Sequence, residues 1–154
     1  MNAIIIYYSR SGNTERIAKQ LQIDLGNIPA IKIEPDEKYG NYIMSCFRVM
    51  KENSSKVIPK FKTPIPDLSE YDTVFLGFPI WAQDVPAFVQ DFVRKCDMKG
   101  KTIIPFATYG MSGISWTKKT LNSLFDEKQI KLPFDSGVFK KGDYQNWLNK
   151  VKLL

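Results

Sequence analysis

Short apolar runs alternate with amphipathic segments along the whole chain, and this alternation restricts the fold more than any other feature. The first run, residues 2–8, is rich in β-branched and aromatic residues, which is typical of a strand buried on both faces. Further strands are predicted over Ala30–Glu34, Thr73–Gly77 and Thr102–Ala107, with an interrupted strand between Ile130 and Phe139. Strands separated in this way by helices predict an α/β fold, a parallel sheet with helices on both faces.

Helical spacing of apolar residues fills most of the intervening segments. Helices are predicted over Thr14–Leu25, Tyr42 to about Asn53, Val85–Cys96 and Ser115–Phe125, and a terminal helix carries Tyr144, Trp147, Leu148 and Val151. Pro59, Pro64 and Pro66 exclude a helix or a central strand before the third strand, and we interpret that stretch as a surface excursion. With 154 residues, the chain is predicted to form a single domain over residues 1–154.

The composition is that of an ordinary globular protein, with 44% apolar and 25% charged residues. No run approaches the roughly 18–20 apolar residues that a membrane span needs. The start, Met1-Asn2-Ala3-Ile4, lacks the basic leader of a secretory signal. We therefore expect a soluble, cytoplasmic protein with no membrane span.

Histidine is absent, and the two cysteines, Cys46 and Cys96, are far apart in the sequence. These facts exclude histidine-based general base chemistry and nearly all transition-metal sites, so no catalytic or metal-binding residue is predicted. We interpret both cysteines as reduced thiols packed inside the fold.

The net charge of +6 indicates a surface suited to anionic partners. The basic residues are spread out, and the adjacent pairs are Arg94-Lys95, Lys118-Lys119 and Lys140-Lys141. Because no long basic run or nucleic-acid motif is present, we expect no nucleic-acid binding.

A hydroxyl-rich loop follows the first strand and leads into a helix, with the sequence Ser9-Arg10-Ser11-Gly12-Asn13-Thr14. Free backbone N–H groups, the helix dipole and hydroxyl groups together favour a phosphate at such a place. The alternative is an ordinary turn in which Asn13 or Thr14 caps the helix. The loop matches neither the Walker pattern nor the dinucleotide fingerprint.

Two more loops follow the third and fourth strands. Residues 77–86 contain Pro79 and Trp81, which suit a flat aromatic ligand. A lone tryptophan is more usually a core or lid aromatic, which is the alternative for Trp81 and our interpretation of Trp116 and Trp147, on helix faces. Residues 108–113 include small residues and glycines that let the backbone approach a ligand closely; the alternative is a plain strand-to-helix turn. Three such loops at one sheet edge favour one shared cofactor, because ligands of these sheets bind beyond the strand ends.

At this point the chain resembles the flavodoxin family, in residues 7–14, 77–81 and 100–110, in matching order over essentially the whole chain. The resemblance implies a flavodoxin-like three-layer sandwich with strand order 2-1-3-4-5 and flavin mononucleotide (FMN) at the switch point of that order. It implies a phosphate loop formed by Ser9, Arg10, Ser11, Gly12, Asn13 and Thr14. It also implies a flavin ring flanked by Pro79, Ile80, Trp81 and Ala82 on one side and by Thr108, Tyr109, Gly110 and Gly113 on the other.

Two features depart from the family pattern. Flavodoxins that carry electrons are typically acidic, whereas this chain is basic, and Met111 stands where many relatives have a second glycine. The resemblance implies electron transfer through bound FMN to a redox partner protein or a small-molecule acceptor. Two alternatives stay open: an NAD(P)H-dependent FMN oxidoreductase acting on quinones or similar acceptors, and a non-redox binding module for another phosphorylated ligand.

Overall fold

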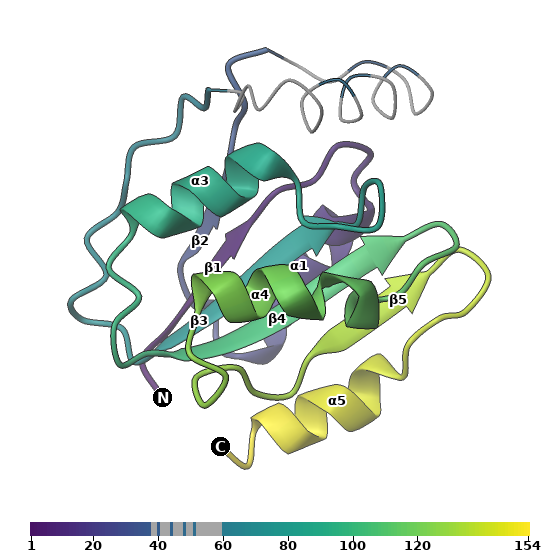
Figure 1. Ribbon diagram of the computed structural model, residues 1–154. Helices are drawn as coiled ribbons and strands as arrows, with labels where there is room; N and C mark the ends of the chain where they lie inside the picture. Colours follow the sequence, from purple (N-terminus) through teal and green to yellow (C-terminus); the bar gives the residue numbers. More distant parts are fainter. Residues whose placement is uncertain (38–39, 41–43, 45–47, 49–50, 52–59) are drawn as a thin grey trace.

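The computed structural model describes residues 1–37, 40, 44, 48, 51 and 60–154, and Figure 1 shows their arrangement. The strands are β1 (Ala3–Tyr7), β2 (Ala30–Lys32), β3 (Thr73–Pro79), β4 (Thr102–Tyr109) and β5 (Phe134–Gly137). The helices are α1 (Asn13–Asp24), α3 (Ala87–Lys95), the short 3₁₀ helix η1 (Ile114–Thr117), α4 (Lys118–Leu124) and α5 (Tyr144–Val151). The helix predicted over 42–53 lies largely outside the described residues.

The strands form one five-stranded sheet in the order β2-β1-β3-β4-β5. All neighbouring pairs are parallel, with Ile5 opposite Ala30 and Phe106 opposite Phe134 at the two edges. The predicted fold class and strand order are therefore confirmed. Because all strands run in the same direction, the loops that follow β1, β3 and β4 come together at one edge of the sheet.

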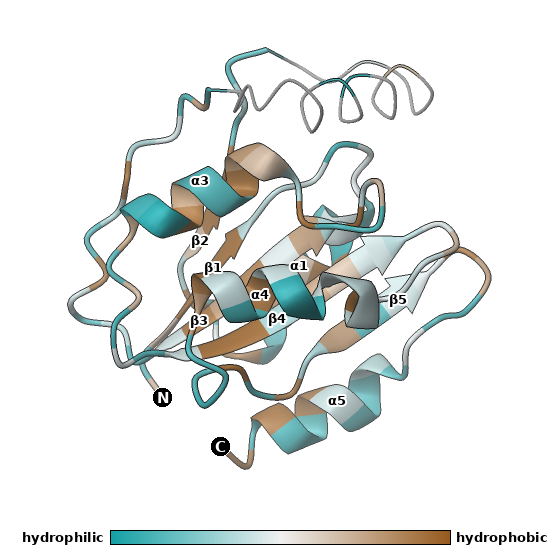
Figure 2. Cartoon of the chain, in the orientation of Figure 1, coloured by the Kyte–Doolittle hydropathy of each residue, from teal (hydrophilic) through white to brown (hydrophobic). Residues whose placement is uncertain are grey.

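Successive side chains of the central strands point to opposite faces of the sheet, and this alternation divides the core into two layers. In β1, Ile4 and Ile6 face the layer built with α3 and α4, while Ala3, Ile5 and Tyr7 face the layer built with α1 and α5. Figure 2 shows brown stretches along the strands, and brown and teal residues mixed along the helices α3, α4 and α5 that cover the sheet. Since both faces of the sheet are covered, the central strands are apolar at nearly every position.

An irregular pairing joins β4 to the chain before β5. The Ile103 N–H donates to the Gln129 carbonyl, and the Ile103 carbonyl accepts from the Lys131 N–H. Backbone groups two residues apart in a strand point to the same side, so the nitrogen of Pro105 also points toward this segment. Proline has no N–H to donate. The carbonyl of Leu132 instead accepts a hydrogen bond from the indole Nε1 of Trp147, at 2.7 Å. The indole N–H of Trp147 thus takes the place of the backbone N–H that Pro105 lacks, which explains why proline is tolerated inside this strand.

Two sequence-based expectations differ from the structure. The predicted helix Ser115–Phe125 begins as a 3₁₀ turn at Ile114 and becomes α-helical only at Lys118. Within that turn Trp116 is 59% exposed, so it does not belong to the core, whereas Trp147 is buried as expected. Among the described residues, no helix is long and apolar enough to span a membrane.

Candidate functional site

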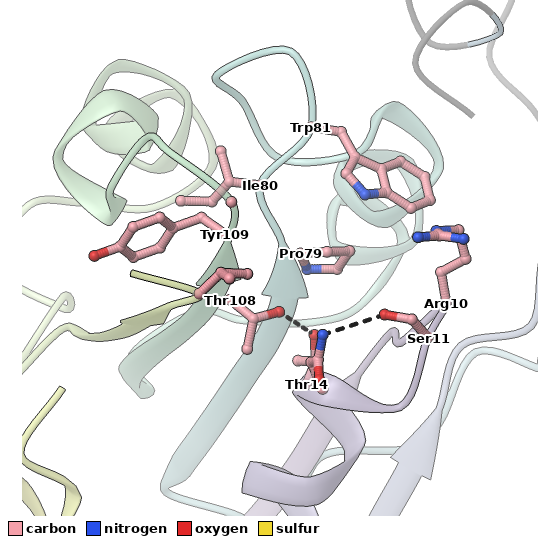
Figure 3. A pocket seen from close by; sticks show the side chains of 11 residues that line it. Arg10, Ser11, Thr14, Pro79, Ile80, Trp81, Thr108 and Tyr109 are labelled. Atoms are coloured by element: carbon pink, nitrogen blue, oxygen red, sulfur yellow. Dashed lines mark hydrogen bonds between the residues drawn. The ribbon is translucent and has the colours of Figure 1, made fainter. Parts of the chain in front are cut away.

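A pocket of about 130 Å³ opens where the loops after β1, β3 and β4 meet (Figure 3). Most of the predicted site residues line it, together with one that the sequence did not indicate: Arg10, Ser11, Asn13, Thr14, Pro79, Ile80, Trp81, Thr108, Tyr109, Gly110 and Val138. Ser9, Gly12, Ala82 and Gly113 lie in the same loops but not in the pocket lining. The topology thus brings three segments that are distant in sequence to one place.

The start of α1 is open toward this pocket. Gly12 occupies the N-cap position with φ of 88°, a left-handed conformation that favours glycine, and no side chain caps the helix. The alternative interpretation, in which Asn13 or Thr14 acts as the N-cap, is therefore wrong. The Gly12 N–H donates to the hydroxyl of Ser9 at 3.1 Å, which fixes the loop before the helix. An uncapped helix start presents N–H donors and a positive dipole end, which together suit an anion.

A hydroxyl pair ties this loop to β4. The side-chain oxygens of Thr14 and Thr108 lie 2.7 Å apart, and both residues are buried. One hydroxyl donates to the other, so the donating group has used its proton while the acceptor still has one to give. Figure 3 shows the pair at the floor of the pocket, between α1 and the end of β4. The pair therefore fixes the distance between two walls of the site.

We expect Thr108→Val to lower the free energy of unfolding by about 1–3 kcal/mol, because the buried Thr14 hydroxyl loses its partner. Thr14→Val should cost a similar amount. The double variant should cost much less than the sum of the two, since neither buried hydroxyl is then left unpaired. Urea denaturation of the four proteins measures this coupling, and additive losses would contradict the pairing.

A tight turn follows Ile80 on the β3 side. Trp81 and Asp84 exchange two backbone hydrogen bonds of 3.0 and 2.9 Å, and the residues between them, Ala82 and Gln83, have φ of 47° and 65°. Positive φ at both central positions defines a type I′ turn, which usually carries asparagine or glycine there. Ala82 is thus at the turn tip. The turn holds Trp81 in place at the pocket wall.

Trp81 itself is packed into the core rather than standing free. It is only 6% exposed, and its ring meets that of Tyr8 edge to face, with centroids 5.4 Å apart. Tyr8 packs in the same way on Phe88 at 4.7 Å, and burial raises the pKa of the Tyr8 hydroxyl well above its usual value. Trp81 therefore offers the pocket a small, rigidly held part of its surface.

Tyr109 is turned toward β5. Its hydroxyl donates to the carbonyl of Lys140 at 3.5 Å, and a Cβ atom added to Gly137 would overlap its ring. Burial, followed by the nearby charge of Asp135, raises the pKa of this hydroxyl. Figure 3 shows the ring pointing away from Trp81, so the two aromatic residues do not face each other across the pocket.

A family model described as Flavodoxin matches residues 2–151. The chain belongs to the flavodoxin family. No curated protein matches it.

Solved structures of similar fold include a protein from Bacteroides uniformis described as a flavoprotein, with 29% identity, a TM-score of 0.82 and 97% coverage of each chain. A flavoprotein from Lactobacillus acidophilus, in complex with FMN, has 15% identity, a TM-score of 0.74 and 96% coverage of each chain. A flavodoxin from Fusobacterium nucleatum, bound to FMN, has 10% identity and a TM-score of 0.56, with 98% of this chain and 96% of that chain covered.

Arg10, a predicted phosphate-loop residue of this flavodoxin, has its side chain directed out of the loop. Its guanidinium donates to the carbonyl of Gly40 at 3.2 Å, and Figure 3 shows it on the Trp81 side of the pocket. Gly113 has an extended backbone, with φ of −165°, which any residue can adopt, so the backbone conformation does not require a glycine at this position.

Sequence reasoning missed two residues of this flavodoxin at the site. Val138 lines the pocket, and Asp135 accepts a hydrogen bond from the Ile114 N–H at 2.9 Å, which joins β5 to the loop after β4. Asp135 lies in β5 and Val138 directly follows it. The loop after β5 lies at the same edge of the sheet as the loops after β1, β3 and β4, and this position was the signal that could have indicated both residues.

Proposed function

We propose that this chain binds FMN through residues 9–14, 79–82, 108–110 and 113 and transfers electrons through the bound flavin. The observation that carries the proposal is the uncapped start of α1, which opens into a pocket that also contains the hydroxyls of Ser11 and Thr14. Such a group of N–H and hydroxyl donors at a helix start favours a phosphate monoester. We further propose that residues 1–154 act as one domain; the cytoplasmic location stays a prediction.

The dimensions of the pocket bear on how the cofactor fits. Pockets that enclose a drug-sized ligand usually measure about 300–1,000 Å³. The hollow here measures about 130 Å³, which suits the phosphate end of FMN better than the whole molecule. We therefore propose that the phosphate is enclosed, while the flavin ring rests on the outer walls that Pro79, Trp81 and Gly110 provide.

FMN is the flavin contained in the similar structures from Lactobacillus acidophilus and Fusobacterium nucleatum, and this supports FMN rather than another phosphorylated ligand. When bound, FMN supplies the electron chemistry, accepting and giving one or two electrons. The protein's own residues would bind, orient and partly shield it. We propose the electron-carrier role over NAD(P)H oxidation because the flavodoxin family match covers residues 2–151.

Reconstitution tests the proposal. The purified chain is mixed with FMN, freed of unbound flavin and examined by absorbance, then reduced with dithionite without oxygen and reoxidised by a small neutral quinone. We expect a stable yellow protein whose flavin undergoes this cycle. Failure to retain FMN would contradict the proposed cofactor. Rapid oxidation of NADH or NADPH by the yellow protein would instead favour the oxidoreductase.

We expect Trp81→Ala to weaken FMN binding more than Trp116→Ala does. Trp81 lies in the pocket wall, and a well-placed aromatic contact contributes roughly 0.5–1.5 kcal/mol beyond its buried area. Trp116 is on η1 and outside the pocket lining. Titration of flavin fluorescence measures both affinities. Wild-type affinity in Trp81→Ala would show that the indole does not contact the flavin.

A further inference from the structure

Large apolar side chains are exposed beside the pocket, on the loops that follow β4 and β5. Met111 is 90% exposed, Phe139 85% and Val138 64%. In Figure 2 the loop after β5 turns brown just beyond the arrowhead. Scattered exposed apolar residues are common, but several on adjoining loops at a binding site are typical of an interaction surface.

The two loops are joined to each other, which makes their apolar residues a defined surface. The Val138 N–H donates to the Tyr109 carbonyl at 3.1 Å, and the Gly137 N–H donates to the Lys140 carbonyl at 2.8 Å. The Tyr109 hydroxyl also reaches the Lys140 carbonyl. Because Val138 lines the pocket as well, the surface is continuous with the proposed flavin site. A surface held in this way loses little conformational freedom when a partner binds.

Exposed lysines lie close in sequence to these apolar residues. Lys140 and Lys141 follow Phe139 directly, Lys119 lies in the first turn of α4, and all three are exposed. Together with Met111, Val138 and Phe139 they are called here the β4–β5 loop surface.

Two carboxylates close in sequence to the loop after β5 accept hydrogen bonds within the protein. Asp135 accepts from the Ile114 N–H, and Asp143 accepts from the Asn146 N–H as the N-cap of α5. Glu127, which follows the end of α4 and is not part of these loops, pairs with Lys118 at 3.6 Å, so this pair adds no net charge. Because a carboxylate keeps its charge when it accepts a hydrogen bond, the balance is set by numbers: three exposed lysines, Lys119, Lys140 and Lys141, stand against Asp135 and Asp143, which leaves a small excess of positive charge around an apolar centre.

We propose that the β4–β5 loop surface docks a redox protein whose contact face carries carboxylates around an apolar centre. The proposal rests on the proposed electron-transfer function and names the partner chemistry of that same site. Charge complementarity selects an acidic partner, because basic and acidic faces steer each other together and like charges repel. Because Val138 belongs both to the apolar centre and to the pocket lining, a partner docked on this centre has its redox centre near the pocket mouth.

The probe is a pair of electron acceptors with the same haem and opposite surface charge: native cytochrome c, which is basic, and cytochrome c whose lysines have been succinylated. The FMN-loaded chain is reduced with dithionite, freed of excess reductant and mixed with each acceptor in a stopped-flow instrument without oxygen. Two ferric haems become ferrous for each reduced flavin that is oxidised, and the flavin's protons go to solvent. Haem absorbance gives the rate.

We expect the succinylated acceptor to be reduced at least about tenfold faster than the native one at ~10 mM ionic strength, with the rates converging near ~500 mM because salt screens the attraction. Lys119→Glu/Lys140→Glu/Lys141→Glu should lower the succinylated rate about tenfold or more and raise the native rate. The matched control, Lys99→Glu/Lys150→Glu/Lys152→Glu, has the same net charge, with exposed lysines remote from the pocket. It should change both rates less than about threefold.

The apolar centre is tested with Phe139→Ser against Leu153→Ser, whose parent residues are 85% and 87% exposed. Phe139→Ser should slow reduction of the succinylated acceptor at both ionic strengths, and Leu153→Ser should not. Equal effects would contradict the apolar contact.

A small neutral quinone separates this proposal from the proposed function. If every variant reduces the quinone at one rate while the cytochrome rates are independent of salt, the docking surface is wrong and flavin electron transfer stands. If the wild-type chain retains no FMN or fails to reduce the quinone, the proposed function itself fails.

Discussion

FMN is expected to bind this flavodoxin at least about a hundredfold more tightly than riboflavin. The two flavins differ only in the phosphate, and the uncapped start of α1 with the hydroxyls of Ser11 and Thr14 is where we place that phosphate. Hydrogen bonds to a charged group contribute about 1.5–3 kcal/mol each. Two of them give about 3–6 kcal/mol, a ratio of roughly 10²–10⁴ in affinity. Titration of the apoprotein by flavin fluorescence or calorimetry measures both constants.

Ser11→Ala is the best variant for testing whether the start of α1 produces this preference for FMN over riboflavin. Ser11 is exposed, and from the described part of the chain its hydroxyl receives only the long contact of 3.4 Å from the Asn13 amide, so its loss should leave stability nearly unchanged. Thr14 is less suitable because its buried hydroxyl also pairs with Thr108. We expect Ser11→Ala to reduce the FMN-to-riboflavin ratio about tenfold by weakening FMN alone. Equal affinities of wild type for the two flavins would place the phosphate elsewhere.

The sheet could be predicted from the sequence because β1, β3 and β4 are buried on both faces, so each is a nearly continuous apolar run. The fifth strand was only partly visible, because Leu132, with φ of 40°, and the following proline interrupt its pairing before Phe134. Trp116 is interpreted from the sequence as a core or lid aromatic on a helix face, but it lies on a 3₁₀ turn, which points side chains in other directions than an α-helix does.

The meeting of the site loops was also predictable, since parallel strands end at one edge, but the orientation of their side chains was not. Nothing local in the sequence shows that Thr14 bonds Thr108, 94 residues away, or that Trp81 is held edge-on to Tyr8. One signal could have been used for Tyr109. A glycine inside a strand often marks a close approach, and Gly137 is where the Tyr109 ring packs.

The largest stability effect is expected for Trp147→Ala. Trp147 is 6% exposed and stacks on Phe134 with ring centroids 4.7 Å apart. Replacing a buried large aromatic residue by alanine usually costs about 3–5 kcal/mol, because contacts are lost and a cavity remains. The change also removes the indole donor on which the Leu132 carbonyl depends, beside a β4 residue, Pro105, that has no N–H to offer. We therefore expect a loss at the upper end of that range.

Trp116→Ala provides the matched control, because the same residue type is removed where its side chain is 59% exposed. Substitutions at such positions usually change stability by less than about 0.5 kcal/mol. Trp147→Phe isolates the hydrogen bond, since it keeps most of the ring volume and should cost about 1–3 kcal/mol for the unpaired carbonyl. Urea denaturation followed by far-ultraviolet circular dichroism compares the three variants without relying on tryptophan fluorescence. If Trp116→Ala and Trp147→Ala lowered the free energy of unfolding by similar amounts, the indole of Trp147 would not bridge α5 to the segment before β5. The explanation of how β4 tolerates Pro105 would then also be wrong.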